Sequence, residues 1–558
     1  MNTPVTYLPI ISDTEGPHGY YPRPQLERDS FLCLNGEWEF SEGGESYNER
    51  ITVPFCPESA ASGIGRRVSD RLFYRRHFSL PDGFVKDRVL LHFGAVDQTC
   101  EVYLNGERAG AHEGGYLPFS IDITSLVTEG ENELCVMVTD TLDHRYPWGK
   151  QKDRRGGMWY TPVSGIWQTV WLESLPVGAV EALTITPTES GAVIRVTGGT
   201  GRKRLTLEGG ETYEFDTDEI TVEPRELVRW TPETPHLYRF TLECGEDRIR
   251  SYFASRTVDI REVGGTNRIC LNGKPYLFNG LLDQGYWQEG IYTPESVEGY
   301  IKDIRLAKSL GFNMLRKHIK IEPMIFYYLC DCMGIAVFQD MVNNGGYSFL
   351  RDTALPTVGL QKIPDKRLNR DPETRRIFNE SMLDTAALLY NTPSVVYYTV
   401  FNEGWGQFES EKLTALLKEI DSTRTYDSVS GWHDQGKGTS ELKSYHIYYK
   451  KFRMPKNEKR CVVLSEFGGY SLPVDGHMFT PGKLFGYRMY KTEKELQAAV
   501  RTLYDTEVLP AVKDGLCATV YTQLSDVEEE INGILTYDRR KNKFAGMDLS
   551  IVYGEGDL

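Results

Sequence analysis

The sequence predicts a multidomain protein: a jelly-roll β-sandwich at residues 1–176, an immunoglobulin-like β-sandwich at 177–263 and a (β/α)8 TIM barrel at 264–558. Three observations support this. The length of 558 residues is too great for one ordinary domain. The first half contains short alternating strands separated by turns, as all-β domains do. The second half alternates strand-like runs with longer helical ones, which is typical of a parallel sheet covered by helices.

Two groups of strands make up the predicted β domains. In the first, "RVLLHFGAV", "CEVYLNGERAG", "NELCVMVTD" and "WQTVWLES" have the length and apolar alternation of strands, and Asn105-Gly106 is a hairpin signal. This group ends near Leu175-Pro176. The second group, "AVIRVTG", "RLTLEG", "YRFTLEC" and "RSYFASRTVDI", fits a seven-stranded sandwich.

The barrel is predicted from eight apolar strands with helices between them. The stretch "PESVEGYIKDIRLAKSLG" spaces apolar residues at helical intervals and ends at Gly311, a residue type that often follows a helix. The runs lie within about 290 residues, near the ~250 typical of this fold. The expected strands are Tyr276–Gln284, Phe312–His318, Ala336–Asp340, Val395–Glu403, Asp427–Trp432, Ser444–Tyr449, Cys461–Phe467 and Cys517–Leu524.

Composition excludes several classes of partner. The net charge of −16 argues against nucleic acid and anionic membranes, because both favour a basic surface. No run of about 18 apolar residues predicts a membrane span, and the first residues lack the basic and apolar regions of a signal peptide. Most of the ten cysteines lie in apolar runs, and Cys330-x-Cys332 has no second pair at zinc-site spacing. We expect a cytoplasmic protein without cofactor or metal.

Polar residues end nearly every predicted barrel strand. In a TIM barrel the carboxyl ends of the strands form the active-site rim. Single polar ends are ordinary surface residues, but eight on one rim indicate a site. The candidate substrate-binding residues chosen from these ends are Asp283, Arg316, His318, Asn402, Trp432, His446 and Tyr448.

Glu403 and Glu466 are the candidate catalytic residues. Each ends a strongly apolar strand and is followed by glycine-rich sequence, "EGWG" and "EFGG". Two opposed carboxylates suit hydrolysis of a glycosidic bond, in which one protonates the leaving oxygen and the other attacks the anomeric carbon or activates water. Asn402 suits a hydrogen bond to the sugar 2-hydroxyl, whereas Arg316 and Tyr448 are placed to hold the ionised carboxylate.

The motifs "FNEGWGQ" and "VVLSEFGG" resemble the acid/base and nucleophile motifs of glycoside hydrolase family 2, the family of β-galactosidases, β-glucuronidases and β-mannosidases. "LNGEWEF" and "SGIWQTVWLE" resemble its jelly roll, "WTPETPHLYRFTL" its immunoglobulin-like domain, and "LNGKPYLFNGLLDQGYW" the start of its barrel. The resemblance implies a retaining exo-β-glycosidase with Glu403 as acid/base and Glu466 as nucleophile, whose carboxyl groups lie about 5–5.5 Å apart. Tyr448 is similar to the family tyrosine that contacts the nucleophile, and Trp432 to a subsite aromatic.

The sugar is less clearly indicated. The glucuronidases have an Asn-x-Lys motif near the last strand, whereas "EEINGILTYDRR" offers Asn532 without the lysine. We therefore expect a neutral hexose such as galactose, with β-glucuronidase and β-mannosidase as alternatives. The stretch "RKHIKIEP" replaces a usual family motif, and its Lys317, His318 and Lys320 form a possible site for an acidic sugar.

Two readings from other classes remain open. A metal-dependent barrel hydrolase would use His318, His433, His446 and Asp283, although "LLDQG" lacks the usual His-x-His pair. A non-catalytic carbohydrate-binding relative would keep the fold without the activity. The expected partner is a small-molecule glycoside or oligosaccharide, and homo-oligomers are possible.

Overall fold

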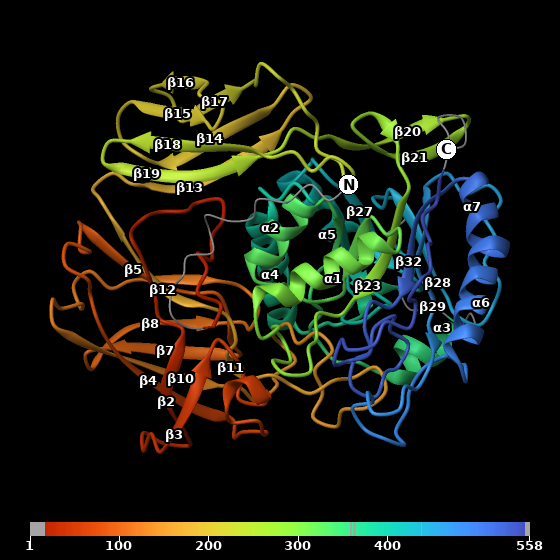
Figure 1. Ribbon diagram of the computed structural model, residues 1–558, viewed down its shortest axis with the longest axis horizontal. Coiled ribbons are helices and arrows are strands. Elements are labelled where there is room, and N and C mark those ends of the chain that lie inside the picture. Colours follow the sequence, from red (N-terminus) through yellow and green to blue (C-terminus); the bar gives the residue numbers. More distant parts are fainter. Residues whose placement is uncertain (1–16, 358–359, 361–363, 437, 553–558) are drawn as a thin grey trace.

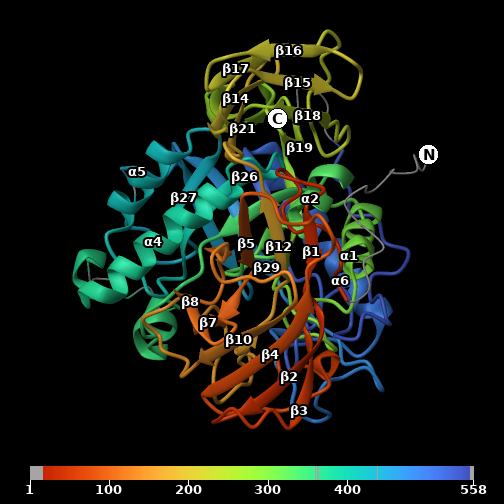
Figure 2. The ribbon, with the colours of Figure 1, turned by 90° about the vertical axis from the view of Figure 1, so that its left-hand side faces the viewer.

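The computed structural model describes residues 17–357, 360, 364–436 and 438–552. Two β-sandwiches lie beside a parallel barrel: the first strands of the chain at the lower left of Figure 1, the next above them, and the barrel at the right. Figure 2 shows the two sandwiches one below the other on the same side of the molecule. The multidomain architecture expected from the sequence is confirmed.

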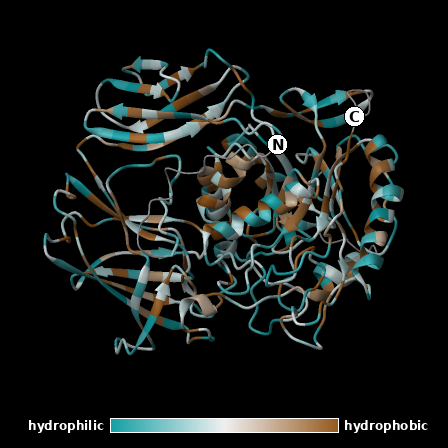
Figure 3. Ribbon diagram, in the orientation of Figure 1, coloured by the Kyte–Doolittle hydropathy of each residue, from teal (hydrophilic) through white to brown (hydrophobic). Residues whose placement is uncertain are grey.

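The first sandwich packs a four-stranded sheet, β1-β12-β5-β9, on a six-stranded sheet, β3-β2-β4-β10-β7-β8. Alternate residues point inward, as in β10, where Leu134, Val136 and Val138 join the buried core. Figure 3 shows apolar and polar residues alternating along the sandwich strands. The strands are β1 (Phe31–Cys33), β2 (Gly36–Glu42), β3 (Glu49–Val53), β4 (Arg71–Ser79), β5 (Arg88–Phe93), β6 (Val96–Asp97), β7 (Thr99–Leu104), β8 (Glu107–Glu113), β9 (Phe119–Asp122), β10 (Glu131–Thr139), β11 (Gly165–Ile166) and β12 (Val170–Leu175).

The second sandwich packs sheet β13-β14-β17 on sheet β16-β15-β18-β19. Its strands are β13 (Val180–Pro187), β14 (Ala192–Gly198), β15 (Lys203–Leu207), β16 (Thr212–Phe215), β17 (Glu219–Val222), β18 (Tyr238–Cys244) and β19 (Asp247–Phe253).

A small separate sheet, β20 (Val258–Val263), β21 (Thr266–Leu271) and β22 (Lys274–Pro275), joins this sandwich to the barrel. Its Val258, Ile269 and Leu271 belong to the same buried cluster as apolar residues of the barrel strands. The change of domain expected between residues 263 and 264 thus falls inside the β20–β21 hairpin.

The barrel has eight strands, in the order β27-β26-β25-β24-β23-β32-β29-β28, and every adjacent pair is parallel. Each expected strand overlaps one of them. They are buried throughout, apart from alternate half-buried residues in β28, which explains their near-continuous apolar sequences. The strands are β23 (Phe278–Asp283), β24 (Met314–Lys317), β25 (Ala336–Asp340), β26 (Val395–Asn402), β27 (Thr425–Ser430), β28 (Leu442–Ile447), β29 (Cys461–Gly468) and β32 (Leu516–Thr522).

The barrel closes between β27 and β28 through serine side chains and one backbone bond, from Glu441 N, just before β28, to Tyr426 O at 3.3 Å. Ser444 Oγ accepts from Gly431 N at 3.2 Å and donates to Val429 O at 3.3 Å, while Ser440 Oγ accepts from Ser428 N at 3.2 Å. In the described part of the chain, no backbone ladder joins β27 to β28, whereas a ladder joins every other adjacent pair of barrel strands.

Helices cover the barrel unevenly. The expected first helix is α1, which ends just before Gly311, a residue with φ +92°. In the described residues, neither the connection from β27 to β28 nor that from β28 to β29 contains a helix. The principal helices are α1 (Val297–Ser309), α2 (Met324–Met333), α4 (Pro372–Leu389), α5 (Ser410–Ile420), α6 (Glu493–Leu503) and α7 (Leu509–Lys513), with shorter turns η1 (Ala60–Ser62), η2 (Phe349–Ala354), α3 (Leu355–Thr357), η3 (Asp365–Arg367) and η4 (Tyr504–Val508), and a short strand pair β30 (Tyr470–Ser471) and β31 (Arg488–Met489). A search of the described helices for one long and apolar enough to cross a bilayer finds none.

Candidate active site

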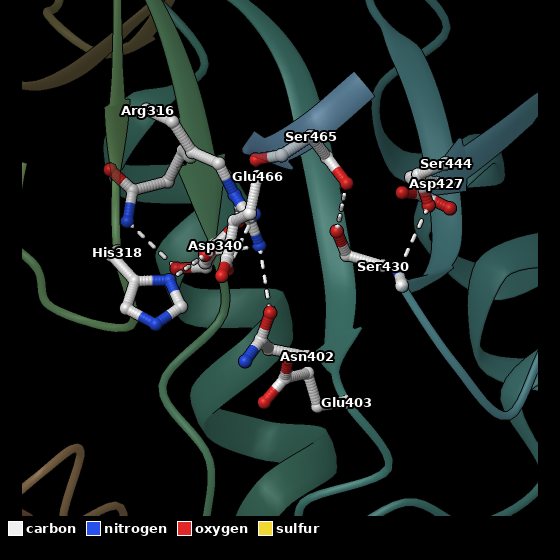
Figure 4. A network of polar contacts seen from close by, with 12 residues as sticks. Arg316, His318, Asp340, Asn402, Glu403, Asp427, Ser430, Ser444, Ser465 and Glu466 are labelled. Atoms are coloured by element: carbon white, nitrogen blue, oxygen red, sulfur yellow. Dashed lines mark hydrogen bonds and ion pairs between the residues drawn. The ribbon is translucent and has the colours of Figure 1, made fainter. Parts of the chain in front are cut away.

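The two glutamates come from the ends of two barrel strands that are not neighbours, β26 and β29, and their side chains meet at the mouth of the barrel. Glu403 directly follows β26, and Glu466 lies near the end of β29. Their carboxylate oxygens, together with His446 Nδ1, lie within 4.8 Å of one another. Figure 4 shows Glu466 and Asn402 reached by the same arginine, with Glu403 beside Asn402. Only 11% of the Glu403 side chain and 7% of the Glu466 side chain are exposed, so both carboxyl groups are largely shielded from water.

The backbone at Glu403 is unusual. Its φ is +50°, the left-handed region that side-chain-bearing residues seldom occupy, although its N–H still bonds Ser430 O of β27 at 3.0 Å. The two following glycines are required by space: a Cβ on Gly404 would lie 2.5 Å from the His433 ring, and one on Gly406 would lie 2.1 Å from Asn344 O. Such strain is concentrated at functional sites, because the surrounding structure must hold it in place.

Glu466 is held in its ionised form. Burial alone would raise its pKa, but His446, Arg316 and His318 oppose this effect, and with a hydrogen bond from Tyr448 they lower the pKa to about 2. Arg316 Nη1 lies 3.1 Å from Glu466 Oε1, and Tyr448 OH donates to Glu466 Oε2. A carboxylate in this state is a nucleophile rather than an acid at neutral pH.

Arg316 organises the site. It is 1% exposed, and its five N–H groups reach both Asp340 oxygens at 3.1 and 2.9 Å, Ser465 O at 3.0 Å, Glu466 and Asn402. Because arginine only donates, Asn402 must present its carbonyl oxygen to it, at 3.0 Å. The amide nitrogen of Asn402 is then left without a partner among the described residues, ready to donate to a ligand.

His446 bridges the two glutamates. Its Nδ1 lies 2.7 Å from Glu403 Oε1 and 3.5 Å from Glu466 Oε2, and its Nε2 lies 3.0 Å from Ser430 Oγ. Ser430 gives its own proton to Ser465 Oγ, so Nε2 must donate to Ser430, while Nδ1 faces carboxylate acceptors. The structure places His446 against both glutamates, and its predicted contact with substrate stays a prediction.

The other predicted residues divide into two groups. Trp432 lies edge-on to His446 with ring centroids 6.3 Å apart, and His318 bonds Asp340 at 2.8 Å, so both belong to the site. Asp283 belongs to a different network, because its carboxylate accepts from Lys317 at 2.6 Å and from Gly285 N at 2.9 Å. No hydrogen bond or ion pair found among the described residues joins it to either glutamate.

The suggested cationic site at Lys317, His318 and Lys320 is already occupied by protein groups. Lys317 and Lys320 both pair with Glu322, at 2.8 and 3.0 Å. Burial lowers the pKa of His318 to about 4, so its ring is neutral at pH 7. The metal reading named His318, His433, His446 and Asp283. In the described residues the one group of three or more metal-type ligand atoms within 4.8 Å of one another is Glu403, His446 and Glu466, which contains only His446 of that set.

A segment of the first sandwich reaches the barrel mouth, which sequence reasoning missed. The Trp148 and Trp159 rings stack with centroids 5.4 Å apart, and the Trp159 ring lies 5.2 Å from that of Trp405, two residues after Glu403. Tyr160 OH donates to Glu530, beyond β32. The signal available in the sequence was "WGKQKDRRGGMWY", a basic and aromatic stretch between two β segments of an acidic chain.

Family models match both parts of this arrangement. Residues 24–176 match the sugar binding domain of glycosyl hydrolases family 2, and residues 262–543 match the TIM barrel domain of that family. The chain belongs to glycosyl hydrolase family 2. The family resemblance noted from the two glutamate motifs is confirmed.

The similar proteins carry different names. A β-galactosidase of Thermoanaerobacter pseudethanolicus is 29% identical over 80% of this chain and 60% of its own length, and a putative β-glucuronidase of Formosa agariphila is 23% identical over 80% and 55%. The chain thus spans little more than half the length of these relatives. A β-glucuronidase structure from an uncultured Clostridium has a TM-score of 0.73 at 18% identity, covering 93% of this chain and 97% of that one, and shares the fold.

Proposed function

We propose that the protein is a retaining exo-β-glycosidase that removes a terminal β-linked sugar by double displacement. The observation that carries this proposal is the pair of shielded carboxylates with oxygens within 4.8 Å, of which Glu466 is held ionised. This spacing suits the ~5–5.5 Å separation of retaining enzymes, because inverting enzymes need about 6.5–9.5 Å to admit a water molecule.

Each residue has a role in this scheme. Glu466 Oε attacks the anomeric carbon as Glu403 delivers a proton to the departing glycosidic oxygen, giving a glycosyl ester on Glu466 and the free aglycone. Glu403 then takes a proton from water, which attacks the anomeric carbon and releases Glu466. Arg316 and Tyr448 keep Glu466 ionised before attack, and Asn402 Nδ2 is placed to bind the 2-hydroxyl. His446 positions Glu403 and is not a substrate ligand in this scheme.

We propose a neutral hexose, with galactose first, as the terminal sugar. The position expected for the glucuronidase Asn-x-Lys motif holds Asn532, which bonds Glu530 and Gln523 at 3.0 and 2.8 Å and has no lysine beside it. Lys317 and Lys320 are paired internally. The β-galactosidase relatives support the same choice.

A panel of nitrophenyl glycosides tests both parts. We expect the highest kcat/KM on the β-galactoside, with the β-glucuronide, β-mannoside and β-glucoside far behind, and early-time NMR should show product with the anomeric configuration of the substrate. A preference for the β-mannoside or β-glucuronide would contradict the sugar, and inversion would contradict the mechanism.

Azide rescue assigns the two glutamates separately. Glu466→Ala should lose activity and, with azide, form the α-glycosyl azide, because azide attacks from the vacated face. Glu403→Ala should accept azide at the glycosyl-enzyme stage and form the β-glycosyl azide. Glu419→Gln, on the exposed side of α5, serves as the control and should match the wild type. If neither glutamate variant loses hydrolysis of any aryl glycoside, the assignment of the two glutamates fails. If the wild type itself hydrolyses none of the panel, the protein is a non-catalytic relative.

A further inference from the structure

Lys150 of the first sandwich enters the barrel mouth on a rigid segment. The segment lies between β10 and β11, and Gly149 packs so closely that a Cβ there would lie 2.7 Å from Tyr116 OH and 3.1 Å from Ile319 O. Lys150 O accepts from Tyr160 N at 3.0 Å. The next side chain, Gln151, bonds Asp97 and Val163 N. The lysine backbone is therefore fixed before any ligand binds.

Lys150 differs from the other buried lysines. Five lysines are buried in the described part of the chain, and four of them have a carboxylate within 3.6 Å: Lys203, Lys317, Lys320 and Lys543. Lys150 is 7% exposed, and its Nζ has no hydrogen bond or ion pair to any described residue. The described side-chain nitrogen and oxygen atoms that are both buried and without a partner do not include Lys150 Nζ, so this ammonium still faces water. Its three N–H donors are therefore open to an acceptor from outside the chain.

The surroundings of Lys150 Nζ are those of the candidate active site. It lies 5.8 Å from the centre of the Trp405 ring, two residues after Glu403, and 5.4 Å from that of Tyr160. The His318 ring is close enough that the charge of Lys150 contributes, after burial, to lowering the pKa of His318. His318 bonds Asp340, which bonds Arg316, so Lys150 lies on the arginine side of the mouth.

The balance of charge decides what kind of acceptor fits. With Glu403 protonated as the acid, the groups around the mouth carry four positive and five negative charges, namely Arg316, Lys317, Lys320 and Lys150 against Asp283, Glu322, Asp340, Glu466 and Glu530. Farther out, Glu528 and Glu529 share the single Arg155. A substrate carboxylate would add to a negative site, whereas sugar hydroxyls supply acceptors without charge.

We propose that Lys150 is a specificity-determining residue that donates hydrogen bonds to hydroxyl groups of the terminal sugar, away from the scissile bond. The inference rests on the proposed glycosidase function and extends it, because it makes the first sandwich part of the sugar site. Aromatic faces at Trp405 and Tyr160 would border the same ring.

The test combines enzyme variants with deoxy substrates. On the best aryl glycoside of the panel, Lys150→Met should lower kcat/KM by about 10- to 100-fold, as for loss of a hydrogen bond to a charged group. The 3-deoxy, 4-deoxy and 6-deoxy forms of that glycoside should include at least one that already lacks the contact. On that deoxy glycoside, the kcat/KM values of the wild type and of Lys150→Met should differ by less than threefold. Lys150→Arg should keep part of the activity.

Two controls keep the result interpretable. Lys152→Met removes a neighbouring ammonium that lies 4.9 Å from the Trp159 ring centre, and it should leave kcat/KM within twofold of the wild type. The melting temperature of Lys150→Met should be no lower than that of the wild type, because the ammonium that is removed makes no hydrogen bond or ion pair to a described residue. A clearly lower melting temperature would mean that Lys150 is a structural residue and would overturn the proposal.

The remaining outcomes are also decisive. An equal loss on every deoxy glycoside would show that Lys150 meets no hydroxyl. A loss confined to the β-galacturonide, with the β-galactoside unchanged, would show that it binds a carboxylate. Both overturn the inference while leaving the glutamate assignments intact, since failure of the proposed function would instead appear as an active Glu466→Ala variant.

Discussion

Tyr448→Phe tests the hydrogen bond to Glu466, the proposed nucleophile, separately from the rest of the site. The change removes only the hydroxyl that donates to Glu466 Oε2 and contacts Thr522 Oγ1 at 3.3 Å. The ring should stay in place, because it stacks on Tyr487 with centroids 3.8 Å apart and an interplanar angle of 4°. Any change in Glu466 can then be attributed to the lost donor.

The magnitude follows from the strength of such bonds. A hydrogen bond to a charged group contributes about 1.5–3 kcal/mol. At 1.36 kcal/mol for each pKa unit, its loss should raise the pKa of Glu466 by about one to two units. Starting from the present pKa of about 2, the variant should titrate near pH 3–4.

The assay is inactivation by a 2-deoxy-2-fluoro glycosyl fluoride of the preferred sugar between pH 3 and 8, which traps the nucleophile only when it is ionised. The wild-type rate constant should stay flat to the lowest pH, whereas that of Tyr448→Phe should fall by half near pH 3–4. Activity regained after return to pH 7, in samples without inhibitor, excludes acid unfolding. A wild-type rate that falls with a pKa of 4–5, or identical profiles, would refute the reasoning.

Three further changes test other parts of the structure. Arg316→Met leaves Asp340 and Glu466 buried without their counter-ion. The free energy of unfolding, measured in urea, should therefore fall by about 3–5 kcal/mol, and a loss below about 1 kcal/mol would contradict the argument from burial. His446→Ala removes the contact that positions Glu403, and kcat should fall about 10- to 100-fold in steady-state assays with KM less affected; an unchanged kcat would exclude this role. Burial raises the pKa of Glu58 to about 7, so its contribution to stability is greatest below pH 4.5 and is lost as the pH rises through 7. Glu58→Gln should therefore stabilise the protein at pH 8, by up to about 3 kcal/mol, and not at pH 4, as measured by urea unfolding at both pH values.

Local pattern was sufficient for the barrel and its two glutamates. The strands ending at Asn402 and Gly468 are buried on both faces, so their sequences are apolar up to the residues that reach the mouth. An acid at the end of such a run is conspicuous. Tyr448 was identified for the same reason, because it lies one residue beyond β28.

Contacts between distant parts of the chain could not be predicted from the sequence. The role of His446 depends on which neighbours its two nitrogens meet, and these come from β26, β27 and β29. Asp283 is a carboxylate at the end of a barrel strand, as a site residue would be, but its carboxylate bonds Lys317. Lys150 lies 253 residues before Glu403, and only packing of the first sandwich on the barrel brings it to the mouth.

The serine-linked closure between β27 and β28 has a consequence for motion. Both strands have a backbone ladder on one side only, so their outer amides should exchange with deuterium faster than those of β24 or β25, which are paired on both sides. Ser430 and His446 lie on the two sides of this junction and are joined to each other. Glu403 N bonds Ser430 O at the end of β27, so opening of this junction would change the distance between Glu403 and Glu466.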